Sequence, residues 1–209
     1  MQQSGYKINS PHAYSSTDYS RNGEIYKLQQ HTVGNGIRIL FTGDAFSDRL
    51  INDGTYEKVM VQAMENFFEI EPYKSYRDRF DVYVYVAVSE NEYIGLNTVF
   101  NTSAHGDIVD VDYSPLIKAL EDSPEIDLKN NQEITCAVII NITSDVFPYR
   151  VNASYALDGF GVCNVMANQF NGTLWHEMNG HAFASLGDEY TEDAIRMSEE
   201  GKEYFKTFQ

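Results

Sequence analysis

Three apolar runs rich in β-branched residues limit the folds open to this chain. They lie at residues 37–41, 81–88 and 134–142, and glycine or polar turn residues flank them. Runs of this length and composition predict strands that are buried on both faces. Residues 56–68, between the first two runs, carry apolar side chains at intervals of three and four, which predicts an amphipathic helix. This order of strand, helix and strand favours an α/β fold with a twisted, mostly parallel sheet.

The rest of the chain gives weaker signals. We expect a short helix at residues 116–121, a weaker strand at 160–166, a helix from Thr173 to about residue 186, and a final helix over 192–208. Thr173 would cap its helix by accepting a backbone N–H with its hydroxyl. Residues 1–26 are rich in serine, tyrosine, asparagine and glycine without an apolar period, so we interpret them as an extension or linker. The remaining residues, 27–209, are enough for one domain with one core.

Composition excludes some classes of partner. The chain has 209 residues with 31 acidic and 15 basic side chains, and its net charge of −16 repels phosphate backbones. Nucleic acid is therefore not expected as a partner. No apolar run reaches the roughly 20 residues that a membrane span needs. The two cysteines, Cys136 and Cys163, have no CxxC spacing, which argues against a disulfide scaffold or a cysteine-based zinc site.

The segment HEMNGH, residues 176–181, contains the residue types of a zinc hydrolase site. Such a site needs two neutral imidazoles aimed at one point, a third ligand, and a carboxylate that takes the proton of the bound water. In the common HExxH pattern the two histidines are four residues apart. Here His176 and His181 are five apart, so on a regular α-helix they would diverge by roughly 140°. We therefore predict a local π-bulge at residues 178–180, which would absorb the extra residue.

The residues that follow supply further oxygen donors. Two histidines and a glutamate on a helix also arise by chance, because surface and core histidines are commoner than ligands. Asp188, Glu189 and Tyr190, however, place two carboxylates and a phenol just after a helix end predicted at residues 186–187. A third metal ligand is therefore available close to the histidines.

The stretch HEMNGHAFASLGDEY, residues 176–190, resembles the signature of the M64 family of metallopeptidases, which is named for IgA peptidases. That signature runs roughly HExGH, a few small or apolar residues, and then Asp-Glu-Tyr. This chain differs from it by one residue inserted between Glu177 and His181. Similarity to the family covers roughly residues 27–190 and includes Glu71-Pro72-Tyr73. The resemblance implies a zincin, metzincin-like catalytic domain with an active-site helix, and it implies that the domain at 27–209 is incomplete at its C-terminus.

The resemblance also implies roles for individual residues. His176 and His181 would bind Zn2+, and Glu177 would be the general base that activates the zinc-bound water. Asp188 matches the acid that follows the helix in the family, and zinc accepts its short oxygen donor. Glu189 is the alternative third ligand.

These residues predict a zinc-dependent metalloendopeptidase that acts on a protein or peptide substrate. One alternative is a non-catalytic binding or adhesion module that retained the peptidase fold, and another is a metal-dependent hydrolase of other carbonyl compounds. Cleavage of immunoglobulin A does not follow from these residues, and neither does an oligomeric state. By analogy with such families we expect a secreted or cell-surface bacterial protein, although the first residues lack the pattern of a signal peptide.

Two further features bear on the site. Asp44 follows the first predicted strand, where it could serve either as a functional group or as a turn-stabilising residue. By analogy with related zinc peptidases, the strand at residues 136–142 is expected to be the sheet edge along which a peptide substrate aligns.

Overall fold

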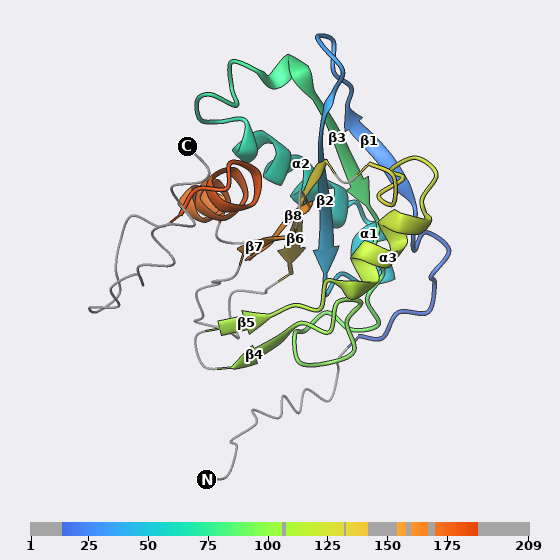
Figure 1. Ribbon diagram of the computed structural model, residues 1–209. Helices are drawn as coiled ribbons and strands as arrows, with labels where there is room; N and C mark the ends of the chain where they lie inside the picture. The colour runs from blue at the N-terminus through green and yellow to red at the C-terminus, as the bar shows by residue number, and fades with distance from the viewer. Residues whose placement is uncertain are drawn as a thin grey trace, which may run out of the picture.

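A mixed sheet of six strands forms the centre of the molecule (Figure 1). The computed structural model describes residues 14–105, 108–131, 133–141, 154–157, 160–166 and 170–187. The sheet has the order β1-β3-β2-β6-β8-β7, with β1 at Ile25–Gln29, β2 at Ile37–Asp44, β3 at Phe80–Tyr85, β6 at Ile134–Ile140, β7 at Ser154–Leu157 and β8 at Phe160–Met166. The four inner strands are parallel, and β1 and β7 are antiparallel to their neighbours. The mostly parallel α/β sheet expected from the sequence is confirmed.

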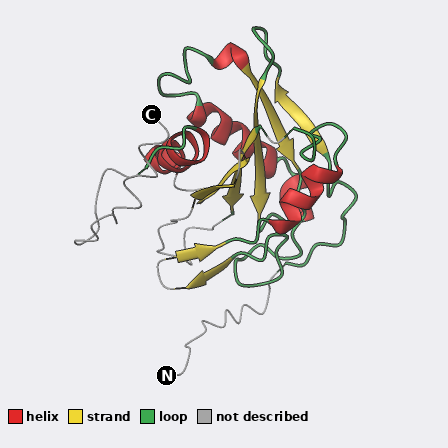
Figure 2. Cartoon of the chain, viewed as in Figure 1, coloured by secondary structure: helices red, strands yellow, loops and turns green. Residues whose placement is uncertain are grey.

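Helices cover both faces of this sheet (Figure 2). They are α1 at Asp48–Asn52, α2 at Thr55–Phe67, the 3-10 helix η1 at Arg77–Arg79, α3 at Ser114–Asp122, α4 at Phe170–Leu174 and the π-helix η2 at Trp175–Phe183. A small antiparallel pair, β4 at Ser103–His105 and β5 at Ile108–Asp110, lies outside the main sheet. Within the described ranges, no helix has the length and apolar character required to cross a bilayer.

The alternation of side chains along each inner strand produces two cores, one on each face. On β2, Ile39 and Phe41 join a cluster with α2, α4 and η2, whereas Leu40 joins a second cluster with α3. All three side chains are fully buried. Each such burial stabilises the fold by about 1.5–3 kcal/mol. This double coverage explains why the inner strands are apolar at most positions, on both faces, instead of alternating regularly with polar residues.

Several predicted elements agree with the structure and several differ from it. The strand predicted at 160–166 coincides with β8, and the helix predicted at 56–68 is α2, which begins and ends one residue earlier. The predicted strand extended to residue 88, but β3 ends at Tyr85 and the apolar residues 86–88 form a buried loop. The prediction was too long because a buried loop can have the same composition as a buried strand. The cap predicted at Thr173 is wrong, since Thr173 lies inside α4. The final helix predicted over 192–208 lies outside the described residues.

The edge strand expected at 136–142 is also wrong. β6 lies in the interior of the sheet, because β2 pairs with one side of it and β8 with the other. On this side the sheet continues through β8 to β7, which has only one neighbour among the described strands.

The described part of the N-terminal extension binds to the domain. The Ser16 N–H donates to the Glu90 carbonyl at 2.8 Å, and the backbone N–H groups of Thr17 and Asp18 donate to the Asp48 carboxylate at 2.9 and 2.8 Å. The chain then enters the sheet as β1, which the sequence pattern did not indicate. Residues 14–29 are therefore attached to the sheet and its loops.

Asp44, at the end of β2, is a buried anchor. Its side chain is fully buried and accepts hydrogen bonds from the Ser89 hydroxyl at 3.0 Å, the Phe100 N–H at 3.2 Å and the Thr102 hydroxyl. These bonds fasten the long loop after β3 to the carboxyl end of β2. Of the two roles considered for Asp44, the structure favours the stabilising one.

Candidate active site

The segment that contains the two histidines is a π-helix. Helix α4 passes directly into η2, which spans Trp175–Phe183. The Ala184 N–H donates to the Asn179 carbonyl at 3.2 Å, which is the i to i+5 bond that defines this helix type. The bulge predicted at residues 178–180 is therefore confirmed, and the π-helical segment is longer than predicted.

This helix type brings His176 and His181 together. Their Nε2 atoms lie 3.1 Å apart, and their ring centroids are separated by 4.5 Å with an interplanar angle of 82°. Because the residues are five apart, an α-helix would turn them roughly 140° away from each other. In η2 they instead lie about one turn apart on one side of the helix, with His176 exposed and His181 partly exposed.

The chain reversal after η2 fixes the tautomer of His181. Ser185 has a left-handed backbone with φ of 53°, and the reversal there brings the Leu186 carbonyl to 2.6 Å from His181 Nδ1. A carbonyl only accepts hydrogen bonds, so we assign the proton to Nδ1. The Nε2 atom of the neutral ring then carries a lone pair, and it faces His176. This is the form of imidazole that binds a metal through Nε2.

Glu177, next to His176, is buried. It is 5% exposed, and among the described residues its carboxylate has neither a hydrogen bond nor an ion pair. Buried carboxylates are usually paired, so an unpaired one beside two converging imidazoles is typical of a functional group.

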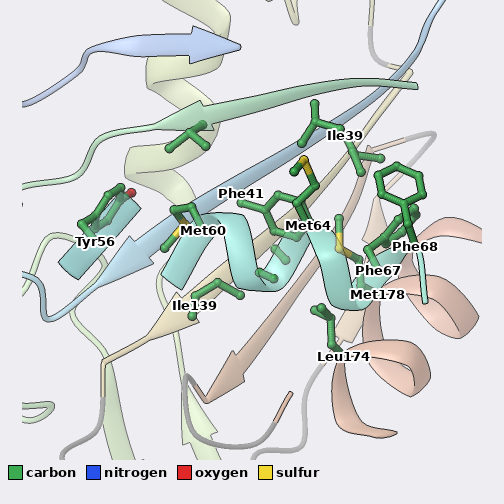
Figure 3. Packing of buried hydrophobic residues seen from close by; sticks show 14 of the residues in the cluster. Ile39, Phe41, Tyr56, Met60, Met64, Phe67, Phe68, Ile139, Leu174 and Met178 are labelled. Carbon is green, nitrogen blue, oxygen red and sulfur yellow. The ribbon is translucent and has the colours of Figure 1, made fainter. Parts of the chain in front are cut away.

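The inner side of the helix packs into the core between the sheet and α2. Leu174 and Met178 are fully buried and point toward Met64 and Phe67 at the C-terminal end of α2 (Figure 3). The two histidines therefore lie on a helix whose opposite side is held in place by apolar contacts with the core.

The two imidazoles fit part of a zinc site. Two Zn–N bonds of about 2.0–2.1 Å that meet at a tetrahedral angle place their nitrogens about 3.3 Å apart. The observed separation of the two Nε2 atoms, 3.1 Å, is close to this spacing. Within the described ranges no group of three or more histidine, cysteine, aspartate or glutamate side chains gathers to hold a metal ion. Asp188, Glu189 and Tyr190 lie outside the described residues, so the fit concerns the histidine pair.

The sequence pattern does not indicate the polar contacts that hold η2 in place. They come from Trp175, Asn179 and Tyr73. The one sequence signal for Tyr73 was its place in a stretch similar to the M64 family, and nothing in the local pattern linked it to the histidine helix.

An α/β domain with a mostly parallel sheet, and with a histidine pair on a helix packed against it, fits a peptidase domain. The family model described as IgA Peptidase M64 matches residues 27–206. The chain therefore belongs to the M64 peptidase family, which implies peptidase activity on a protein substrate. Among curated proteins, no match to the chain was found.

Proposed function

We propose that this chain is a zinc-dependent metalloendopeptidase of the zincin type, in which His176 and His181 bind Zn2+ and Glu177 is the general base. The observation that carries the proposal is the 3.1 Å separation of the two Nε2 atoms across a five-residue spacing. A chance pair of histidines would not need a nine-residue π-helix to bring it together. For the third ligand we propose Asp188, with Glu189 as the competitor, because zinc at a catalytic site takes three protein ligands.

Each residue then has one chemical task. Bound zinc would polarise the scissile carbonyl and lower the pKa of its water. Glu177 would take the proton of that water and later give it to the departing amine. The Leu186 carbonyl would hold His181 in the tautomer that leaves Nε2 unprotonated.

We further propose that the peptide substrate aligns along β7. This strand is the edge of the described sheet on the side of η2, and it packs against that helix. Figure 1 shows β7 beside the orange helix. The unpaired N–H and C=O groups of an edge strand bind an extended peptide by β-addition. In this proposal β7, and not β6, is the edge strand that binds the substrate.

The first experiment is metal analysis of the purified chain by mass spectrometry. We expect close to one zinc per chain, and loss of zinc in His176→Ala and in His181→Ala. His31→Ala is the matched control, because His31 is a partly exposed histidine that pairs with Asp81 and not with the helix. A parent chain that binds no zinc after dialysis against excess metal would sink the proposal and leave the non-catalytic module as the better reading.

Two proposals rest on analogy with the family. One is the secreted or cell-surface location, which secretion assays on the source cell would test. The other is endopeptidase action, as opposed to removal of terminal residues. Mass spectrometry of the products of a long unstructured protein would decide the second question, because an endopeptidase releases internal fragments.

A further inference from the structure

We propose that Tyr73 and Asn179 are positioning residues that hold η2 in its π-helical register and so keep His176 and His181 together. The inference rests on the zinc site proposed above. Tyr73 and Asn179 act through the backbone of the helix.

Asn179 binds with both its side chain and its backbone. It is 2% exposed, and its Nδ2 donates to the Phe67 carbonyl at 3.0 Å. Its own carbonyl accepts two bonds, one from the Ala184 N–H at 3.2 Å and one from the Tyr73 hydroxyl at 2.7 Å. A carbonyl oxygen has two lone pairs. Both are occupied in η2, and the bond from Tyr73 holds this carbonyl from outside the helix, in the position where it accepts the Ala184 N–H.

The bond to Phe67 ties the helix to the end of α2. Phe67 is the last residue of α2, and the last carbonyls of a helix have no partner inside it. Asn179 satisfies that of Phe67, and the Trp175 indole donates at 2.7 Å to the Asn66 carbonyl, which also accepts from the Glu69 N–H at 3.1 Å. The two side chains therefore cap α2 and fix the position of η2 against it.

Packing around the Tyr73 ring holds its hydroxyl at the Asn179 carbonyl. Its ring packs edge-on against Phe67 and Phe183, with centroid distances of 4.8 and 5.5 Å. The residue is 8% exposed, and burial raises the pKa of its phenol, so the hydroxyl keeps its proton at neutral pH and donates. The Phe183 ring also packs on Phe80. The helix is thus fixed at Asn179 and again at its last residue, and His181 lies between these two points.

The amide of Asn179 uses its donor but not its acceptor. Its Oδ1 is buried, and no hydrogen-bond partner for that atom is found among the described residues. Buried acceptors without a partner are rare because they lose their bonds to water. An apolar side chain would avoid this cost but would leave the Phe67 carbonyl without its donor, so the bond from Nδ2 is the interaction that the amide provides. Asn179 also lies between Glu177 and His181, where this chain has one residue more than the HExxH spacing.

The test compares two conservative variants with a matched control. Tyr73→Phe removes only the hydroxyl, and Asn179→Leu replaces the amide with a group of similar shape. Tyr56→Phe is the control, because the Tyr56 hydroxyl is also buried and donates to a backbone carbonyl, that of Tyr85, at 2.6 Å. Zinc affinity is measured by competition with a chelator, and the visible absorption spectrum of the Co2+-loaded protein reports the geometry around the metal.

We expect Tyr73→Phe and Asn179→Leu to weaken zinc binding by about 10- to 100-fold, the range known for groups that orient metal ligands. The Co2+ absorption bands should shift in both variants, and Tyr56→Phe should change neither readout. Unchanged affinity and spectra in a parent that binds zinc would overturn this inference alone. A parent without zinc would overturn the proposed function together with it.

Deletion of Asn179 separates a positioning role from general stability. The deletion leaves the histidines four residues apart, the spacing that an α-helix brings together. In that shortened chain, Tyr73→Phe should no longer affect zinc affinity. An equal loss in the shortened and full-length chains would mean that the hydroxyl supports only the fold, and the inference would be wrong.

Discussion

The Nδ1 atom of His181 lies 2.6 Å from the carbonyl oxygen of Leu186, five residues further along the chain. The contact exists because the chain reverses at Ser185, whose φ of 53° is unusual for a residue other than glycine. The Leu186 N–H meanwhile donates to the Gly180 carbonyl at 3.0 Å, which closes the reversal over the end of η2. The reversal therefore ends the helix and also orients one of the two imidazoles.

Substitution of Ser185 tests this orientation. Ser185→Val places a β-branched side chain on a left-handed backbone, which is strained, so the Leu186 carbonyl should move away from His181. We expect zinc affinity to fall by about 10-fold or more. Ser185→Gly is the matched control, because glycine adopts this backbone without strain and should retain the affinity of the parent. Equal affinities in the two variants, measured by chelator competition, would show that the carbonyl does not orient the ligand.

Substitution of Glu177 separates metal binding from catalysis. Glu177→Gln keeps the shape of the side chain but removes the group that accepts a proton. We expect zinc content to stay near that of the parent, and kcat/KM for an unstructured protein substrate to fall by about 10²- to 10⁴-fold. Glu57→Gln, at an exposed glutamate on α2, should leave both quantities unchanged. Retained cleavage by Glu177→Gln would assign the base to another residue.

Replacement of the two acids after the helix decides the third ligand. Asp188→Ala should reduce zinc content as strongly as His176→Ala, because it would leave two protein ligands where a catalytic site needs three. Glu189→Ala should retain zinc and lose at most the affinity contributed by a neighbouring hydrogen bond, about 10- to 100-fold. The reverse pattern, read by metal analysis of both variants, would exchange the two roles.

Local patterns predicted much of the fold and the position of the histidine pair. The inner strands are apolar at most positions on both faces because helices cover both faces, and this composition is visible in the sequence. The π-helix follows from a mismatch, since His176 and His181 can meet across five residues only if the helix is wider than an α-helix. Both inferences need only residues that are close together in the chain.

Contacts between distant segments were not predicted. β6 was expected at an edge, yet it lies inside the sheet, because strand order depends on how β7 and β8 return and not on the composition of β6. The Tyr73 hydroxyl and the Asn179 carbonyl meet across 106 residues. No periodicity links such positions. From the sequence alone, a tyrosine that positions a helix therefore cannot be distinguished from one that only packs in the core.

The Asp48 carboxylate makes the attachment of the N-terminal segment depend on pH. Burial raises the pKa of Asp48, but hydrogen bonds from the Tyr14 hydroxyl and from the N–H groups of Thr17 and Asp18 lower it more, and the net shift is downward. A carboxylate with a lowered pKa stabilises the fold above its unfolded pKa, about 3.9, and this contribution is lost as the pH falls through the lower folded pKa.

Asp48→Asn should therefore destabilise the protein at pH 7, because the neutral amide is a weaker acceptor for the same donors. The difference in free energy of unfolding between the parent and Asp48→Asn should stay constant from pH 7 to 5 and shrink below about pH 4. Urea unfolding at pH 7, 5 and 3 measures it. Asp122→Asn, at an exposed carboxylate of α3, is the control and should change stability little at each pH. A difference for Asp48→Asn that is unchanged at pH 3 would mean that the charge of Asp48 contributes nothing, and that residues 14–18 are held by their neutral contacts alone.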